Sequence, residues 1–217
     1  MARNKYPEET VNLILETAQR LFTEKGYERT SIQDIIDNLG GLSKGAIYHH
    51  FKSKEDILDA VMTKLSEASN KALLEIQDRS DLTGKEKLKL LLTESVNRSV
   101  HDKVFAAAPN IGASPRLVFS VIRDTVDYVA PHYVLPIIEQ GIKDGSIITE
   151  YPKEIAELIM LVGNLWLDPM IFDDDPEGIY RKCKVFDKML RSFGLDILDE
   201  SVYGRLKELT EIYRRNK

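Results

Sequence analysis

Apolar residues recur at steps of three and four along nearly the whole chain, and this spacing limits the fold more than any other feature. The first such series is Val11, Ile14, Leu15, Ala18, Leu21 and Phe22. It has the period of one face of an α-helix, whereas the two-residue alternation of a half-buried strand is scarce. The sequence therefore predicts an all-α fold, and its 43% of apolar residues is enough for a core.

Helix start and stop signals divide the first third of the chain into short helices. A first helix covers residues 7–26, and a capping box of Thr30 and Gln33 opens a second. Gly40-Gly41 ends the second helix, and a third helix covers 43–51. Short helices joined by a glycine-containing turn are the arrangement of a helix-turn-helix motif.

The helices beyond residue 54 are expected to be longer. A fourth helix, capped by Ser53 and Asp56, should end near Leu65. The predicted division is a three-helix, helix-turn-helix domain at 1–54, a connector helix at 54–65 and a larger helical domain at 66–217. Caps and apolar series also predict the later helices. One starts at the capping box of Thr83 and Glu86, and a long one starts at Ser114-Pro115, is kinked at Pro131 and Pro136 and ends at Gly145. Three more cover 152–167, 176–193 after the cap Asp175, and 200–214.

The third helix carries groups suited to a DNA groove. A helix tip enters the major groove best when it is narrow, and this one begins Ser43-Lys44-Gly45-Ala46, with Ser43 as a cap. Ile47 and Phe51, four residues apart, would form its buried side. The segment adds hydrogen-bond donors and positive charge from Tyr48, His49, His50, Lys52 and Lys54.

The net charge of −5 argues at first against a nucleic-acid binder, but the charges are unevenly distributed. Residues 1–54 carry eight Lys and Arg against seven Asp and Glu, a balance of +1, which leaves −6 for the rest of the chain. Residues 38–54 include three lysines, two histidines and no acidic residue. An acidic body would repel DNA everywhere except at this basic end.

Two segments are distinctive: Thr30-Ser31-Ile32, and the run Gly41-Leu42-Ser43-Lys44-Gly45-Ala46-Ile47-Tyr48-His49-His50-Phe51-Lys52-Ser53-Lys54. Together they resemble the TetR family of bacterial transcriptional regulators. The resemblance covers about residues 8–65, with one residue more than the family pattern at Gly40-Gly41, which lengthens the turn. It implies an all-α homodimer with an N-terminal DNA-binding domain and a C-terminal domain that senses a small ligand.

The resemblance also implies roles for single residues. The predicted DNA-binding set is Thr30, Ser31, Ser43, Lys44, Gly45, Ala46, Tyr48, His49, His50, Lys52 and Lys54. Within it, Thr30, Tyr48 and Lys54 would contact phosphates, while residues 44–46 and His49 would face base edges.

The ligand-binding residues are harder to predict, because an apolar pocket lining and an apolar core look alike in sequence. The candidates are Phe105, Phe119, Arg123, Tyr128, His132, Trp166 and Met170. Each has core packing or a subunit interface as its alternative. Arg123 can meet an anionic ligand or pair with Asp127 four residues on, and we favour the pair.

Two C-terminal helices are apolar on more than one side. Residues 155–167 are apolar nearly all round, and the helix after Pro176 is apolar on two faces. Such helices need cover on two sides. We therefore expect a homodimer formed through helices near 152–168 and 176–194.

Other functions have less support. Cys183 is the single cysteine, which excludes a disulfide framework and multi-cysteine metal sites and fits a reducing cytosol. The segment 41–45 matches a hydrolase nucleophile elbow, but a helix precedes it in place of a strand. The acidic loop at 173–184 lacks the final glutamate of a calcium loop. We expect a cytoplasmic protein with no enzymatic activity, no metal, no cofactor and no membrane span.

The favoured interpretation is a ligand-responsive repressor that binds a palindromic operator in double-stranded DNA as a homodimer, with an unidentified small-molecule effector. The alternative is a ligand-independent DNA-bound factor of the same fold, acting in chromosome organisation or cell division. A small hydrolase is a distant third.

Overall fold

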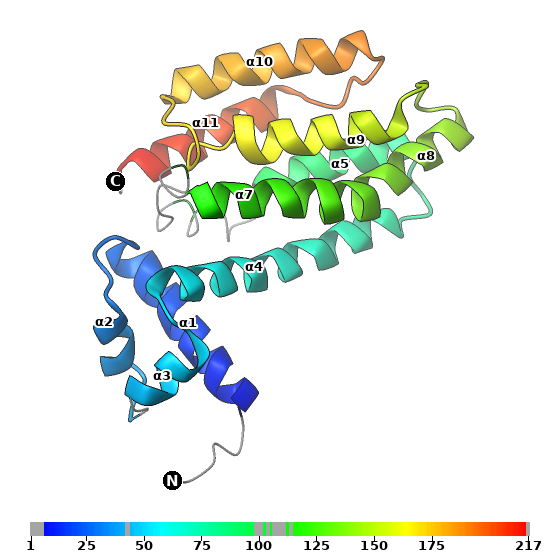
Figure 1. The fold of residues 1–217 in the computed structure, drawn as a ribbon. Coiled ribbons are helices and arrows are strands. Elements are labelled where there is room, and N and C mark those ends of the chain that lie inside the picture. The colour runs from blue at the N-terminus through cyan, green and yellow to red at the C-terminus, as the bar shows by residue number, and fades with distance from the viewer. Residues whose placement is uncertain are drawn as a thin grey trace.

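The computed structural model describes residues 7–41, 44–97, 102, 105, 112 and 115–215. Every regular element in these ranges is helical, which confirms the predicted fold class (Figure 1). The helices are α1 (Pro7–Lys25), α2 (Ile32–Asp37), α3 (Lys44–His50), α4 (Lys54–Gln77), α5 (Gly84–Asn97), α7 (Pro115–Asp124), η2 (Thr125–Val134), α8 (Leu135–Asp144), α9 (Pro152–Leu161), η3 (Val162–Trp166), α10 (Pro176–Ser192) and α11 (Glu200–Arg215). Among the helices described, none combines the length and the apolar character needed to cross a bilayer.

The smaller domain is built from α1, α2, α3 and the start of α4 (Figure 1). Ile14 and Leu21 of α1 are buried in its core, where they join Ile35 of α2 and Ile47 of α3. Ile57 brings the first turn of α4 into the same core. Each short helix therefore contributes one apolar face, and its other face stays in solvent.

The cap of α2 lies one residue later than predicted. Ser31, and not Thr30, precedes the helix, and its hydroxyl accepts a hydrogen bond from the N–H of Asp34. The Asp34 carboxylate accepts in return from the N–H of Ser31. This is the reciprocal arrangement of a capping box with Asp in the place of Glu or Gln, which is why the Thr30–Gln33 spacing misled the prediction.

α4 extends to Gln77, well beyond the predicted end at Leu65. The polar sequence at 66–71 interrupts the apolar series, which resumes at Leu73 and Ile76. Both of these side chains pack against the core of the larger domain. Figure 1 shows α4 running from the smaller domain along the larger one, so this helix belongs to both domains.

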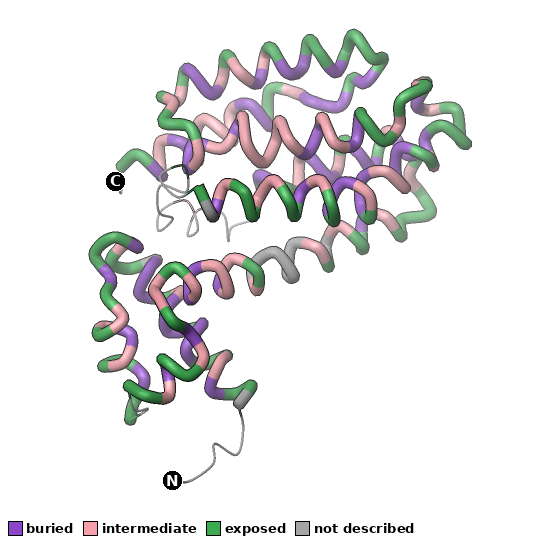
Figure 2. Tube along the Cα trace, in the orientation of Figure 1, coloured by how far each residue is buried: buried purple, intermediate pink, exposed green. Residues whose placement is uncertain are grey.

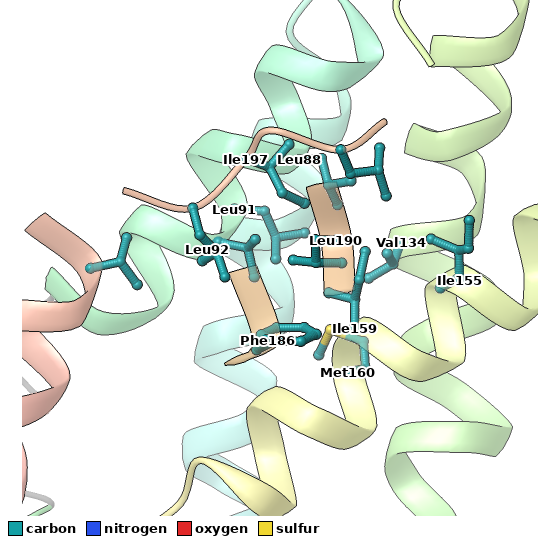
Figure 3. Close-up of a cluster of buried hydrophobic side chains, with 14 of the residues drawn as sticks. Leu88, Leu91, Leu92, Val134, Ile155, Ile159, Met160, Phe186, Leu190 and Ile197 are labelled. Atoms are coloured by element: carbon teal, nitrogen blue, oxygen red, sulfur yellow. The ribbon is translucent and has the colours of Figure 1, made fainter. Parts of the chain in front are cut away.

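The larger core lies between α5, α8, α9, α10 and α11. Figure 3 shows Leu88 of α5, Ile159 of α9 and Leu190 of α10 converging from three helices, and all three side chains are wholly buried. Figure 2 shows the buried positions on the inner faces of these helices and the exposed ones outside. The apolar series that predicted the helices thus also mark their inner faces.

Three predicted helix caps are confirmed. The N–H of Thr83 donates to the carboxylate of Glu86 at 2.8 Å, which completes the box before α5. At the start of α10 the Asp175 carboxylate accepts a hydrogen bond from the N–H of Gly178. At the start of α4 the Ser53 hydroxyl accepts one from the N–H of Asp56. These short polar side chains satisfy backbone N–H groups that have no partner within the helix.

The helix expected over 115–145 changes its winding in the middle. Residues 125–134 form the π-helix η2, which contains Pro131, and 135–144 return to an α-helix. A second π-helical stretch, η3, replaces the end of the helix predicted at 152–167. Proline removes a backbone donor and pushes the chain away from regular α-helix, and short π segments recur at functional sites.

The two domains also touch outside α4. The core of the smaller domain also includes three buried side chains from the larger domain: Leu117 of α7, Tyr213 of α11, and Met170 between η3 and α10. The smaller domain is therefore held by the covalent helix and by side chains of the larger domain.

Lys87 of α5 lies at the far end of α4 and is only 4% exposed. Its ammonium group donates to the carbonyl of Gln77 and to Oε1 of Gln140, both at 2.6 Å. A cation at a helix C-terminus satisfies terminal carbonyls and interacts favourably with the helix dipole. Lys87 thus fixes the end of α4 to α5 and α8.

Replacing Lys87 by methionine keeps most of the side-chain volume but leaves both acceptors without their donor. We expect Lys87→Met to lower the free energy of unfolding by about 2–3 kcal/mol, as measured by urea denaturation. Lys89→Met on the same helix is the control, because Lys89 forms an exposed ion pair with Asp199. Such pairs contribute at most about 1 kcal/mol, so equal losses would contradict the role of Lys87.

Candidate nucleic-acid interface and internal cavity

The turn before α3 depends on two glycines. Gly40 and Gly41 have φ angles of +61° and +113°, which side chains of L-residues rarely adopt. They also mark the position at which the sequence has one residue more than the TetR pattern that it resembles. Leu42 and Ser43 lie outside the described residues, so the cap expected from Ser43 stays a prediction.

α3 has one buried and one exposed face, as its spacing predicted. Ile47 is wholly buried and Phe51 nearly so. The exposed face carries Lys44, Gly45, Tyr48 and His49. The ammonium group of Lys44 lies 5.8 Å from the centre of the Tyr48 ring, a cation–π contact that keeps both groups on this face. Hydrogen-bond donors, a cation and an exposed glycine are thus brought together on one short helix.

The remaining residues of the predicted set flank this face. Lys52 and Ser31 are exposed, and Ala46 and His50 are half-buried. The His50 ring lies 5.1 Å from that of His49, so the two imidazoles form one cluster at the end of α3. No acidic residue occurs in the sequence from 38 to 54, so α3 itself carries no negative charge.

Thr30 and Lys54 are placed differently from the expected phosphate contacts. Thr30 is 1% exposed, and its hydroxyl donates to the carbonyl of Gly26 at 2.9 Å. Its side chain therefore stabilises the loop before α2. The ammonium group of Lys54 donates to the carbonyl of Tyr27 at 2.9 Å and lies 4.1 Å from the centre of the Tyr27 ring. Lys54 would have to give up these interactions to reach a phosphate.

The larger domain contains an internal cavity of about 420 Å³. Its walls come from α4, α5, α7, η2, α9, η3, α10 and α11, and most of the lining side chains are apolar. Met62 and Ile76 contribute two positions along α4. Ligand pockets for small molecules are of this size and composition.

Two of the seven predicted pocket residues, Phe105 and Met170, line the cavity. Phe119 is 63% exposed on the surface of α7. Arg123 pairs with Asp127, with 2.5 Å between the charged atoms, as the sequence favoured.

The other three candidates also lie outside the lining. Tyr128 and His132 are exposed on η2, and the His132 ring lies 4.8 Å from that of Tyr128. Trp166 packs against the ammonium group of Lys182, which lies 5.3 Å from its ring centre. Five of the seven candidates therefore lie at surface or packing positions outside the cavity lining.

The polar residues of the cavity were missed. Among them are Glu94, Asp124, Asn164 and Asp168. Asn164 donates to the hydroxyl of Thr125 at 3.3 Å and so connects the two π-helical segments. The available signal was a polar residue within an apolar run, as at Asn164 and Asp168, and not an aromatic one.

Burial sets the chemistry of two cavity residues. It raises the pKa of the Asp168 carboxyl to about 7, although the N–H of Met170 donates to that carboxyl at 2.8 Å. Burial also raises the pKa of the Cys183 thiol to about 12. The thiol is therefore protonated and weakly reactive at neutral pH, whereas Asp168 changes charge there.

Comparison with known proteins supplies the family. The N-terminal domain of bacterial regulatory proteins of the tetR family matches residues 14–61, and the tetracyclin repressor-like C-terminal domain matches residues 93–189. The uncharacterized HTH-type transcriptional regulator YhgD of Bacillus subtilis is 30% identical over 69% of this chain and 77% of its own length. The chain belongs to the TetR family.

Two further comparisons agree with this TetR assignment. The HTH-type transcriptional repressor KstR2 of Mycobacterium tuberculosis is 31% identical over 61% of this chain and 66% of its own length. The crystal structure of a TetR-family regulator from Pectobacterium atrosepticum has the same fold, with a TM-score of 0.62 and 22% identity over 88% of this chain and 97% of that one. As a TetR-family member, this chain is a DNA-binding transcriptional regulator whose helix-turn-helix is α2 and α3.

The raised pKa of Asp168 predicts a pH-dependent stability. Its carboxyl has a pKa near 3.8 when unfolded and about 7 when folded, so the folded state binds the extra proton between these values. The free energy of unfolding should therefore fall as pH rises from about 4 through 7. Between pH 5 and pH 8 we expect wild type to lose about 2–3 kcal/mol relative to Asp168→Asn, measured by urea denaturation at each pH. Parallel pH profiles of the two proteins would contradict this.

Proposed function

We propose that this regulator is a ligand-responsive repressor that binds a near-palindromic operator as a homodimer and releases it when a small molecule occupies the cavity. The observation that carries the proposal is the course of α4. Its first turn packs in the core that supports α3, and its later turns, at Met62, Asn70 and Ile76, line the cavity. A ligand in the cavity therefore contacts the same helix that positions the DNA-reading helix α3.

The dimer is proposed to form through residues 152–168 and 176–194. Val185 and Met189 of α10 and Phe193, which follows its last residue, are exposed at successive four-residue steps and make an apolar stripe on the outer face of the larger domain. Phe172, in the segment between η3 and α10, is also exposed. A two-fold partner would cover this stripe.

A dimer is also what the size of α3 requires. Its seven residues can read only a few base pairs, so specificity needs two copies. Two reading helices about 34–36 Å apart engage successive major grooves of a palindromic site. A tilt of α4 in either subunit would change that separation. A ligand can cause the tilt only if it binds the tilted conformation with a different affinity from the untilted one.

We propose that the chain binds and does not catalyse, and that it needs no cofactor besides its effector. The segment 41–45, which resembles a nucleophile elbow in sequence, follows the helix α2, whereas an elbow needs a preceding strand. Because operator DNA is the proposed target, we place the protein in the bacterial cytoplasm.

The DNA contacts are tested by titrating operator DNA from upstream of the protein's own reading frame in a gel-shift assay. We expect Tyr48→Phe to weaken binding to all sequences about three- to tenfold, because a phosphate contact is lost. Lys44→Ala should weaken binding at least tenfold, because it removes a donor at the tip of α3. Lys71→Ala, an exposed lysine of α4, is the matched control.

Wild-type affinity in both α3 variants would contradict the site, and the absence of salt-sensitive, sequence-specific binding would contradict the function. Release of the operator by a small molecule separates the proposed repressor from the ligand-independent factor of the same fold. The cavity favours the repressor.

A further inference from the structure

The charged side chains that the structure places along the cavity are all acidic. They are Glu94 on α5, Asp124 at the end of α7 and Asp168 after η3. Within the described ranges, none of the three carboxylates forms an ion pair with a lysine or arginine, although carboxylates on the outer surface commonly do, as Asp127 does with Arg123. Among the described residues, the cavity therefore offers negative charge without a basic partner.

Asp168 is the group with the strongest need for a partner. One of its oxygens, Oδ1, accepts from the N–H of Met170, and the described part of the chain donates no hydrogen bond to the other. The residues on either side in the cavity wall, Leu167 and Met170, are apolar and buried. An ionised carboxylate in such surroundings is costly unless a cation approaches it.

We propose that the effector is a lipophilic organic cation, an amine or quaternary ammonium on an apolar body, with its positive group held against Asp168. This rests on the proposed function, because it names the ligand of the same cavity. The apolar walls take the body of the molecule, and the carboxylate gains a counter-charge that none of the described residues supplies there. An anion of equal size would lie in a cavity whose charged lining residues are the half-buried Glu94 and Asp168 and the exposed Asp124, and their negative charge opposes its entry.

Among the titratable groups around the cavity, Asp168 is the one whose charge we expect to change near neutral pH. Tyr213 of α11 faces Asp168, and burial and the negative charge of Asp168 raise the pKa of its phenol to about 12. Burial raises the pKa of Tyr203 well above its ordinary value and that of Cys183 to about 12. Partial burial also raises the pKa of Asp124. A permanent cation needs the ionised form of Asp168, so its affinity should increase between pH 6 and pH 8.

The test uses three probes with the same apolar chain: decyltrimethylammonium, 1-decanol and decanoate. Their dissociation constants for the full-length protein are measured by isothermal titration calorimetry at submicellar concentrations. We expect the cation to bind at least tenfold more tightly than the alcohol and the alcohol more tightly than the anion. Equal affinities, or a preference for decanoate, would overturn the proposal.

Variants separate the charge of Asp168 from its packing. Asp168→Asn keeps the shape and the acceptor for the Met170 N–H, and it should weaken cation binding at least tenfold while changing 1-decanol affinity less than threefold. It should also abolish the increase in cation affinity between pH 6 and pH 8. Asp127→Asn is the control, because Asp127 is an exposed carboxylate outside the cavity lining. Unchanged cation affinity in Asp168→Asn would overturn the assignment.

Operator binding is measured separately, so the two proposals fail in different ways. If the protein binds the cation but keeps its operator, the ligand class stands and the proposed release mechanism is contradicted. If operator binding responds to another compound while the cation does not bind, the mechanism stands and the ligand class is overturned.

Discussion

The structure depends on one continuous helix whose two halves are packed in different cores. Near its start α4 contributes Ile57 and Val61 to the core that supports the DNA-reading helix. Near its end Ile76 packs in the larger core, and Lys87 holds the terminal carbonyl of Gln77. A helix held at both ends transmits a tilt along its length, because its backbone hydrogen bonds resist bending. The position of α3 is therefore tied to the packing of the larger domain.

The cavity is where that packing is least complete. Its walls include both π-helical segments, and Asn164 of one bonds to Thr125 of the other. A void forfeits contacts among its lining side chains, and the Asp168 carboxylate, which has no basic partner among the described residues, adds a cost of desolvation. A domain that needed only stability would fill the void and neutralise the acid. Retaining both is what a ligand site requires, since the ligand then supplies the missing contacts and charge.

The sequence predicted what depends on local chemistry. The helical period identified the fold class, and Ser53, Thr83 and Asp175 marked helix starts because a cap needs only neighbouring backbone groups. The buried positions Ile47 and Phe51 of α3 followed from their four-residue spacing.

Features that depend on tertiary contacts were missed. The extension of α4 rests on a core that forms only in the folded chain, and the kink expected at Pro131 takes the form of a π-helix. The family resemblance assigned Thr30 to phosphate, and nothing local in the sequence indicates that its side chain is buried with its hydroxyl bonded to the carbonyl of Gly26. Phe119 and Tyr128 were taken for pocket residues because an exposed aromatic and a lining aromatic look alike in sequence.

The central claim is that filling the cavity moves the reading helix through α4. Gly163 tests it without any ligand, because it lines the cavity and a Cβ added there meets nothing within 4 Å. Operator affinity should fall at least about fivefold in Gly163→Leu, at the lower end of typical coupling between sites. It should stay within twofold of wild type in Gly204→Leu, whose Cβ also meets nothing but which lies on α11 outside the cavity lining. Wild-type operator affinity in a folded Gly163→Leu protein whose cavity is shown to be filled would contradict the claim.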